Sequence, residues 1–362
     1  MSYPAQGQPK VKRIDLSVLS AIAALVALCV IMLGAYVRLS DAGLGCPDWP
    51  GCYGRLTAPS DAESIAAANA EHPQRPVESD KAWKEMVHRY LASALGLIII
   101  VIAAVAWSRR KEQGGAAVAL TWFLVALVVF QGLLGMWTVT LLVNPVIVTS
   151  HLAGGLATLA LLWWLTIRQG RLFDAQPSAA LLRLRPWAWG GLALICAQIL
   201  LGGWTSTNYA AVACTEFPTC YGGLWWPETN FRQGFTLWRP LGIDYEFGVL
   251  DSAARTAIHL THRIGALVVL IYAGALAVQV IQKADNGSHR GIGIILWAAL
   301  LLQIGLGIGN VVGHLPLPVA VAHNGGAALL MLAMLTLVHI LNPHDGLTPI
   351  LSSETSGAVH EQ

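Results

Sequence analysis

The sequence predicts an all-α polytopic membrane protein, with eight transmembrane helices arranged as two tandem four-helix bundles related by pseudo-two-fold symmetry. Hydrophobic residues make up 55% of the 362 residues and charged residues only 12%, whereas a soluble domain carries about 25% charge. Eight stretches are long and apolar enough to span a bilayer, and landmarks of the first half recur in the second. The composition excludes disordered, collagen-like and disulfide-dense small proteins, and the net charge of +2 gives no nucleic-acid footprint.

Eight spans are expected because a bilayer-spanning helix needs about 20 mostly apolar residues. Such stretches lie near residues 16–38, 86–107, 116–138, 147–167, 187–206, 256–281, 292–312 and 319–340. The first stretch follows a short basic segment, as the core of a signal peptide would. Its apolar run is too long for a signal peptide, however, and no small-residue cleavage site follows it. We therefore interpret it as a retained first span.

The distribution of basic residues predicts the orientation in the membrane. One side collects, against few acids, Lys10, Lys12, Arg13, Arg109, Arg110, Lys111, Arg168, Arg171, Arg183, Arg185, Lys283 and Arg290. The opposite side has two long loops, near 39–85 and 207–255, that are rich in Asp and Glu. By the positive-inside rule, we expect a multi-pass protein of a bacterial inner membrane, with both termini in the cytoplasm and both long loops in the periplasm. The tryptophans expected to anchor the outer interface are Trp49, Trp83, Trp204, Trp225 and Trp226.

The first half of the sequence recurs in the second half. The segments GAYVRLSDAGLGCPDWPGCYG (34–54) and GGWTSTNYAAVACTEFPTCYG (202–222) match at a constant shift of 168 residues. EMVHR (85–89) matches HLTHR (259–263) at a shift of 174. At a shift of 172, the matched residues are Gln131 with Gln303, Gly135 with Gly307, and His151 with His323. Landmarks in the same order indicate a duplicated four-helix unit with a pseudo-two-fold axis along the membrane normal.

The duplication sets the expected domain boundaries. A cytoplasmic tail (1–15) precedes the N-terminal four-helix half (16–167), and a cytoplasmic linker (168–186) joins it to the C-terminal half (187–340), which a second cytoplasmic tail (341–362) follows. The other cytoplasmic loops are short, so successive helices should pack antiparallel.

Each even-numbered span carries one histidine near its outer end: His88, His151, His262 and His323. Ionisable groups inside a span are costly and mark function by default. Imidazoles from facing helices can supply both axial ligands of a haem iron, which predicts the pairs His88 with His151 and His262 with His323. Zinc is the weaker interpretation because it needs three or four convergent ligands. A proton relay would not need the paired duplication, and an interhelical hydrogen bond is the structural alternative for a lone histidine.

Glycine and arginine residues flank the predicted ligands. Arg89 and Arg263 each follow the first histidine of a pair at the outer membrane edge. They are candidate partners for haem propionates, and snorkelling to lipid phosphates is the alternative. Two glycines follow the second histidine of each pair, where a flat macrocycle or a neighbouring helix can approach the backbone closely: Gly154, Gly155, Gly325 and Gly326.

The two halves differ at one position beside the predicted ligands. Glu85 precedes His88 by three residues and so lies on the same helix face, one turn toward the outside. Its counterpart in the second half is His259. A carboxylate beside a haem pocket can relay protons, position water or stabilise a cationic intermediate. The alternative is a surface glutamate that the helix dipole favours.

The outer loops contain two C-x5-C pairs, Cys46/Cys52 and Cys214/Cys220, each followed by Tyr-Gly. Because the outer compartment is oxidising, we expect a disulfide in each pair. Stapling a loop over each pocket is one role, and a labile redox-active bond is the other.

With these residues the chain resembles haem A synthase, the membrane enzyme family that matures haem for cytochrome oxidases. The resemblance covers nearly the whole chain and rests on ExxHR at 85–89, THR at 261–263, His151, His323, CPDWPGC (46–52) and CTEFPTC (214–220). It implies an oxidoreductase that acts on a CH3 group. In this family, successive hydroxylations convert the C8 methyl of haem O to the formyl group of haem A.

The resemblance also implies roles for individual residues. The C-terminal half would bind haem b between His262 and His323, and the N-terminal half would bind the substrate haem O between His88 and His151, with Glu85 as the catalytic carboxylate. The first cysteine pair would serve activity or substrate handling, and the second would be a structural disulfide. The implied partners are haem O synthase as the donor of haem O, cytochrome oxidase assembly factors and an electron-transfer partner. Self-association is left open.

Two other classes of function remain open from the sequence. A di-haem b-type electron-transfer cytochrome explains the four histidines, but not the difference between Glu85 and His259 or the paired cysteine loops. A haem transporter or chaperone explains lateral entry of a prenylated haem from lipid. Transporters, however, usually place broken helices, rather than ligands at one edge, in the membrane.

Overall fold

The computed structural model describes residues 15–170, 173 and 175–342 of the chain. Residues 1–14 and 343–362, which contain most of both predicted tails, lie outside the described residues, as do 171, 172 and 174 of the predicted linker. Four of the basic residues used to predict the orientation are among these: Lys10, Lys12, Arg13 and Arg171. Within the described residues the regular structure is helical, with two isolated β-bridges in the long loops.

Eight of the described helices are long and apolar enough to cross a membrane, which confirms the predicted number of spans. They are α1 (Leu16–Leu39), α3 (Ser79–Ser108), α5 (Gly115–Thr140), α6 (Pro145–Gln169), α8 (Arg185–Thr207), α10 (Ser252–Lys283), α11 (Gly287–Val312) and α12 (Leu317–Ile340). Four short helices lie between them: α2 (Ala62–Glu71), α4 (Arg110–Gln113), α7 (Ala179–Leu182) and α9 (Phe231–Gly234).

Several long helices begin at a side chain that caps their free backbone N–H groups. The carboxylates of Asp15 and Asp251 accept hydrogen bonds at the starts of α1 and α10. Asn144 and Asn286 do the same for α6 and α11. α3, α10 and α11 begin at Ser79, Ser252 and Gly287, before the predicted starts at 86, 256 and 292. Polar residues continue these helices beyond the apolar run, so hydropathy alone placed the three starts too late.

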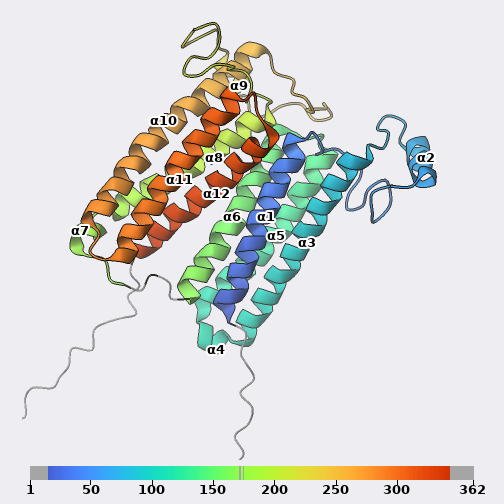
Figure 1. Cartoon of the computed structure of the whole chain (residues 1–362). Coiled ribbons are helices and arrows are strands. Elements are labelled where there is room, and N and C mark those ends of the chain that lie inside the picture. Colours follow the sequence, from blue (N-terminus) through green and yellow to red (C-terminus); the bar gives the residue numbers. More distant parts are fainter. Residues whose placement is uncertain (1–14, 171–172, 174, 343–362) are drawn as a thin grey trace, which may run out of the picture.

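Each half of the chain forms a closed ring of four helices. In the first half, α1 packs against α3 and α6, and α5 also packs against α3 and α6 (Figure 1). In the second half, α8 packs against α10 and α12, and α11 packs against the same two helices. The first histidine of each half therefore lies on a helix diagonally opposite the helix of the second. This arrangement is what a flat group held between two axial ligands requires.

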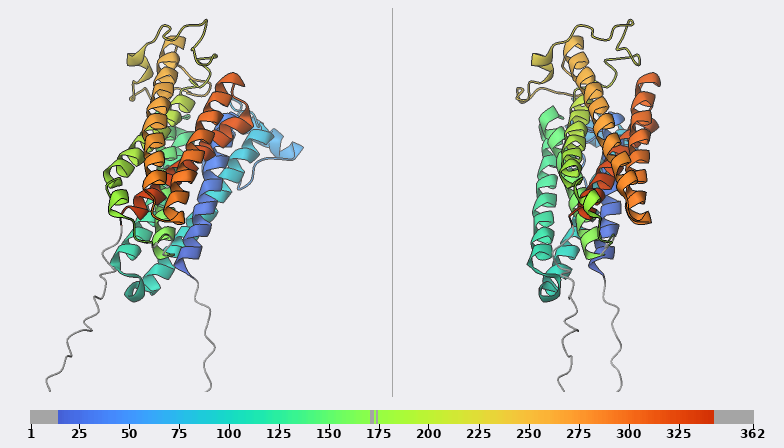
Figure 2. Two further views of the ribbon diagram at one scale, coloured as in Figure 1. Left: turned by 60° about the vertical axis from the view of Figure 1, so that its left-hand side comes forward. Right: turned by 90° about the vertical axis from the view of Figure 1, so that its left-hand side faces the viewer.

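The two halves meet through α1 and α6 on one side and α8 and α12 on the other (Figure 2). Small residues let these helices approach closely, since the side chain of Leu152 packs over Gly203 and that of Met32 over Gly325. Trp163 donates a hydrogen bond across the interface to Thr336 at 2.9 Å.

Contacts between matched residues are consistent with the predicted pseudo-two-fold relation. Arg38 Nη2 donates to the backbone oxygen of Ser206 at 2.8 Å, and these residues are related by the shift of 168. Tyr209 donates to Asp41 at 3.2 Å, and the same shift relates this pair. Direct contact between repeat mates places them near such an axis. Asp41 and Tyr209 also share a positive φ, of 48° and 52°.

The long loops gather at one end of the bundle, which we call the loop end. It comprises residues 40–78, which include α2, and residues 208–251, which include α9 (Figure 1). The second loop extends over the first half, where Tyr245 is buried against Leu44 and Val143 and its backbone N–H donates to Leu142. Arg75 of the first loop fixes this crossing by pairing with Asp244 at 2.6 Å and with Glu246. This crossing was not predicted, because it depends on tertiary contacts between loops that are distant in the sequence.

Candidate functional site

The four predicted ligand histidines lie toward the loop end, two in each half. His88 is on α3 and His151 in the second turn of α6, two helices that lie diagonally opposite in the first ring. His262 on α10 and His323 in the second turn of α12 have the same places in the second ring. The members of each pair expected from the sequence therefore lie on opposite helices of one ring.

Each imidazole ring rests against a glycine of the neighbouring helix. A Cβ atom at Gly34 would lie 3.0 Å from His88 Cε1, and one at the matched Gly202 would lie 3.1 Å from His262 Cε1. On α5 and α11, Gly135 and the matched Gly307 lie in the same way against the Cε1 atoms of His151 and His323. A glycine at these four positions leaves room for the rings. The sequence contained this signal, since all four glycines were repeat landmarks.

Three of these histidines have a buried ring nitrogen with no hydrogen-bond partner: the Nδ1 atoms of His88, His151 and His323. A buried polar atom without a partner is costly and calls for an explanation. Histidines that bind a metal through one nitrogen need a partner for the other, often a water or a carbonyl. The donor set, two imidazoles from opposite helices in each half, fits axial ligation of a haem. No group of three or more His, Cys, Asp or Glu side chains suited to a metal ion occurs in the described part of the chain.

One half-buried glutamine lies beside the second histidine of each pair. A Cβ atom at Gly154 would overlap the amide of Gln131, and one at Gly326 would overlap the amide of Gln303. Gln303 Nε2 is also 3.4 Å from His323 Nε2. These two glycines thus make room for a glutamine. The other two, Gly155 and Gly325, face Ile31 and Met32. All four glycines therefore make room for neighbouring side chains, which favours helix packing over close approach of a macrocycle as their role.

Glu85 is buried, with 5% of its surface exposed, so the surface-glutamate alternative is wrong. Its Oε2 accepts a hydrogen bond from the backbone N–H of Cys46 at 2.9 Å, and its Oε1 pairs with Arg89. His259 occupies the matched place, accepting from the N–H of Cys214 at 3.1 Å and lying 3.3 Å from Arg263. The same hydrogen-bond framework thus holds a carboxylate in the first half and an imidazole in the second.

Arg89 and Arg263 each brace the loop that contains a cysteine pair. Arg89 Nη1 donates to the carbonyls of Asp48, Pro50 and Gly51. Arg263 donates to the carbonyls of Thr219 at 2.8 Å and Cys214 at 3.0 Å. Loop carbonyls are a partner that the sequence interpretation did not include. Binding of haem propionates by these guanidinium groups stays a prediction.

Both expected disulfides are present. Cys46 is bonded to Cys52 and Cys214 to Cys220, and all four residues are buried. A matched carboxylate closes each loop, since Asp48 accepts from the N–H groups of Tyr53 and Gly54 in the first.

In the second loop, Glu216 has the role that Asp48 has in the first. The backbone N–H of Gly223, the hydroxyl of Thr219 and the N–H of Gly222 all bond its carboxylate, and they hold the pKa of Glu216 below its ordinary value. Each loop is therefore a preformed cover for the helix ends beneath it.

Replacing both Cys214 and Cys220 with serine is expected to lower the free energy of unfolding by about 2 kcal/mol, which is the entropy of closing so short a loop. Thermal unfolding of the purified chain in detergent measures the change. The matched control replaces the two free cysteines, Cys29 and Cys196, with serine, because that variant removes no bond. An equal loss of stability in both variants would show that the disulfide has no special role.

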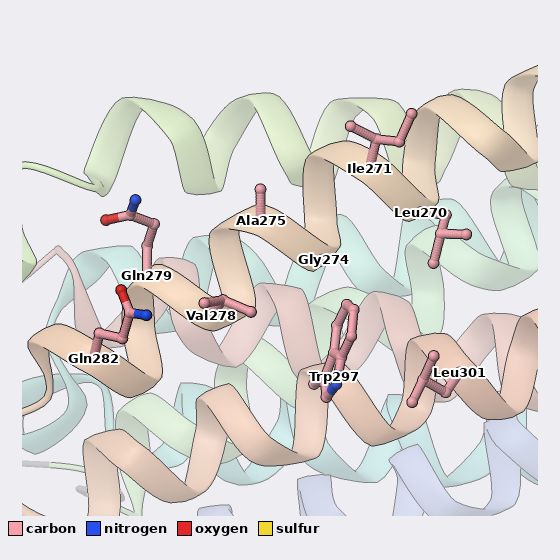
Figure 3. A pocket seen from close by; sticks show the side chains of 9 residues that line it. All are labelled: Leu270, Ile271, Gly274, Ala275, Val278, Gln279, Gln282, Trp297 and Leu301. Carbon is pink, nitrogen blue, oxygen red and sulfur yellow. The ribbon is translucent and has the colours of Figure 1, made fainter.

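A groove of about 720 Å³ lies elsewhere, between α10 and α11 on the outer face of the second half (Figure 3). Gly274 lies beside the Trp297 indole there, and a Cβ atom at Gly274 would overlap it. Two amides, of Gln279 and Gln282, lie at one end of the otherwise apolar lining. The groove contains none of the four paired histidines, and we assign it no chemistry.

The sequence of this chain is similar to those of known proteins over most of its length. Residues 17–335 match the model of a family described as cytochrome oxidase assembly protein. A heme A synthase of Shewanella oneidensis is 44% identical over 316 residues, covering 87% of this chain and 93% of its own. Heme A synthases of Novosphingobium aromaticivorans and Rhodospirillum centenum are 29% and 28% identical, covering 88% and 86% of this chain and 93% and 84% of their own.

Proposed function

Because the chain belongs to the cytochrome oxidase assembly protein family, in which its similar relatives are heme A synthases, we propose that it converts haem O to haem A. The reaction oxidises the C8 methyl group of haem O to a formyl group by successive hydroxylations. We place the protein in a bacterial inner membrane, with the loop end toward the periplasm, because basic residues collect at the opposite end.

One observation carries the proposal beyond haem binding alone. The two halves repeat the same helices, paired histidines, bracing arginines and disulfide loops, yet only the first half has a buried carboxylate in this framework. A protein that only carried electrons between two equivalent haems would not need this difference. We therefore propose that the substrate haem O binds between His88 and His151, and that a resident haem b binds between His262 and His323.

In this assignment the resident haem supplies one-electron chemistry next to the substrate. The side chains of the first half do the positioning: His88 and His151 hold the substrate iron, and Gly34 and Gly135 leave room for their rings. Glu85 lies one turn outward of His88, with its carboxylate fixed by the Cys46 N–H and by Arg89. A carboxylate held in this way can accept a proton released as the methyl carbon is oxidised.

The disulfide loops and the crossing of the second loop over the first half cover the outer ends of the pockets. Such a cover separates the pockets from bulk solvent. Because haem O has a farnesyl tail, we propose that it enters laterally from lipid, handed over by haem O synthase. Each hydroxylation takes its oxygen from water and releases two electrons and two protons, and the hydrated aldehyde then loses water. An electron-transfer partner accepts the electrons, and cytochrome oxidase assembly factors receive the product.

The direct test expresses the chain in a host that makes haem O, purifies it, extracts the pigments and separates them by reversed-phase chromatography. Haem A beside haem b is the expected result. Haem b alone, in both sites and with no new pigment, would instead assign the chain to the di-haem electron-transfer cytochromes. Haem O that is bound and released unchanged would assign it to the haem carriers.

Replacing Gly307 with valine is expected to weaken retention of haem b about tenfold. A Cβ atom at this position would lie 3.2 Å from His323 Cε1, so the added methyl groups displace the ring. Overpacking of this kind costs about 1–3 kcal/mol. Haem b per purified chain is the measurement. Gly305→Val, on the same helix and with nothing within 4 Å of its Cβ position, is the matched control and should retain haem b. Equal retention by both variants would contradict the assignment of His323.

A further inference from the structure

The second half contains a half-buried glutamine that contacts one of the histidines on the side away from its partner helix. Gln198, on α8, places its Nε2 atom 3.1 Å from His262 Nδ1 and donates a hydrogen bond to the backbone oxygen of His262 at 2.9 Å. Space for this amide comes from Gly265 on α10, where a Cβ atom would overlap Gln198 Oε1. An amide inside an apolar span is costly unless it is fully used, and this one contacts the same residue twice.

The first half has no equivalent of this pair. At the shift of 168, the residue matched to Gln198 is Val30, and at the shift of 174, the residue matched to Gly265 is Leu91. His88 has a glycine neighbour at nearly the same distance as His262, but its Nδ1 atom is buried without a partner. The glutamine and the glycine that admits it are therefore present together in one half and absent together from the other.

The difference has a direct chemical meaning for a metal-binding imidazole. Gln198 contacts Nδ1 of His262, which leaves Nε2 as the nitrogen that would bind iron. With iron on Nε2, Nδ1 would carry a proton and need an acceptor. The amide oxygen of Gln198 would supply that acceptor once the amide turns over and gives up its bond to the His262 backbone oxygen. Such an outer partner fixes the orientation of the ring and makes it a stronger ligand.

We propose that Gln198 is a positioning residue that makes the second half retain its haem, while its absence from the first half leaves the His88 side open to exchange. This inference rests on the proposed function, because an enzyme must keep its cofactor and release its product. Two halves with one inherited framework would then differ in haem residence time through one side-chain contact.

The test follows haem transfer from the purified, loaded protein to apomyoglobin, with haem b and haem O or A counted separately by chromatography. In the unmodified protein, haem O and A are expected to leave faster than haem b. Gln198→Leu should release haem b at least about tenfold faster, the loss that removal of an outer-shell partner typically causes. The reciprocal variant, Val30→Gln with Leu91→Gly, should slow release of haem O and A by a similar factor.

A second readout separates positioning from general stability. Gln198→Glu keeps an acceptor at Nδ1 and adds charge, so it should retain haem b and lower its midpoint potential relative to the unmodified protein. Release of haem b from Gln198→Leu at the unmodified rate, with an unchanged potential, would overturn the role of Gln198. The proposed function fails separately, by the absence of haem A from the unmodified protein.

Discussion

Replacing Glu85 with glutamine is expected to lower haem A formation by about 100-fold or more and to leave haem O in the first half. The reason is chemical, because a proton acceptor contributes about 10²- to 10⁴-fold to such a reaction and glutamine cannot act as one. The folded structure should survive, since the glutamine oxygen can still accept the N–H of Cys46. Pigment chromatography of the purified variant gives the haem O to haem A ratio.

His259→Gln is the matched control for this variant, because His259 fills the same framework in the second half and also accepts a backbone N–H. It is expected to form haem A at close to the unmodified rate. Normal haem A output from Glu85→Gln, with normal haem content, would remove Glu85 from the chemistry and leave it only the structural role of holding the Cys46 loop.

Replacing His262 with alanine is expected to lower the haem b content of the purified chain at least about tenfold and to abolish haem A formation. Loss of His262 would remove one of the two bonds that the protein is proposed to make to the haem iron, and even loss of an outer-shell partner costs about 10- to 100-fold in metal affinity. Because His262 and His323 lie on diagonally opposite helices of one ring, His323→Ala should have the same effect.

His88→Ala is the comparison that separates the two halves. It should also abolish haem A formation, but should leave haem b at its unmodified level, since His88 belongs to the other ring of helices. Equal loss of haem b from His88→Ala and His262→Ala would contradict the division into a substrate half and a cofactor half. Pyridine haemochrome spectra of the purified variants are sufficient to decide this.

Much of the fold could be predicted from the sequence because bilayer-spanning helices obey a simple length and hydropathy rule. The repeat then indicated which helices correspond, and the paired histidines followed from it. Glu85 could be identified because the residues beside the predicted ligands differ between the halves at this position, where the second half has His259. Both disulfides followed from short cysteine spacings in loops assigned to an oxidising compartment.

The contacts that support the site were harder to predict. A guanidinium at the membrane edge has several possible partners, and nothing in the sequence shows that Arg89 and Arg263 bind loop carbonyls. The packing of Tyr245 over the first half depends on a loop that folds back across the interface. Gln198 did carry a signal, because an amide within a span is costly. Gln198 and Val30 occupy matched positions of the two halves, so this difference was visible in the same comparison of the halves that revealed Glu85.

The central claim is that each ring of helices holds one haem between two diagonally opposed histidines, with the substrate in the first ring. A cryo-EM map of the protein purified from a host that makes haem O tests this most directly. We predict one macrocycle between His262 and His323 and a second between His88 and His151, with the farnesyl-bearing haem in the first half. A macrocycle in the second ring alone, or a haem bound away from these histidines, would contradict the account.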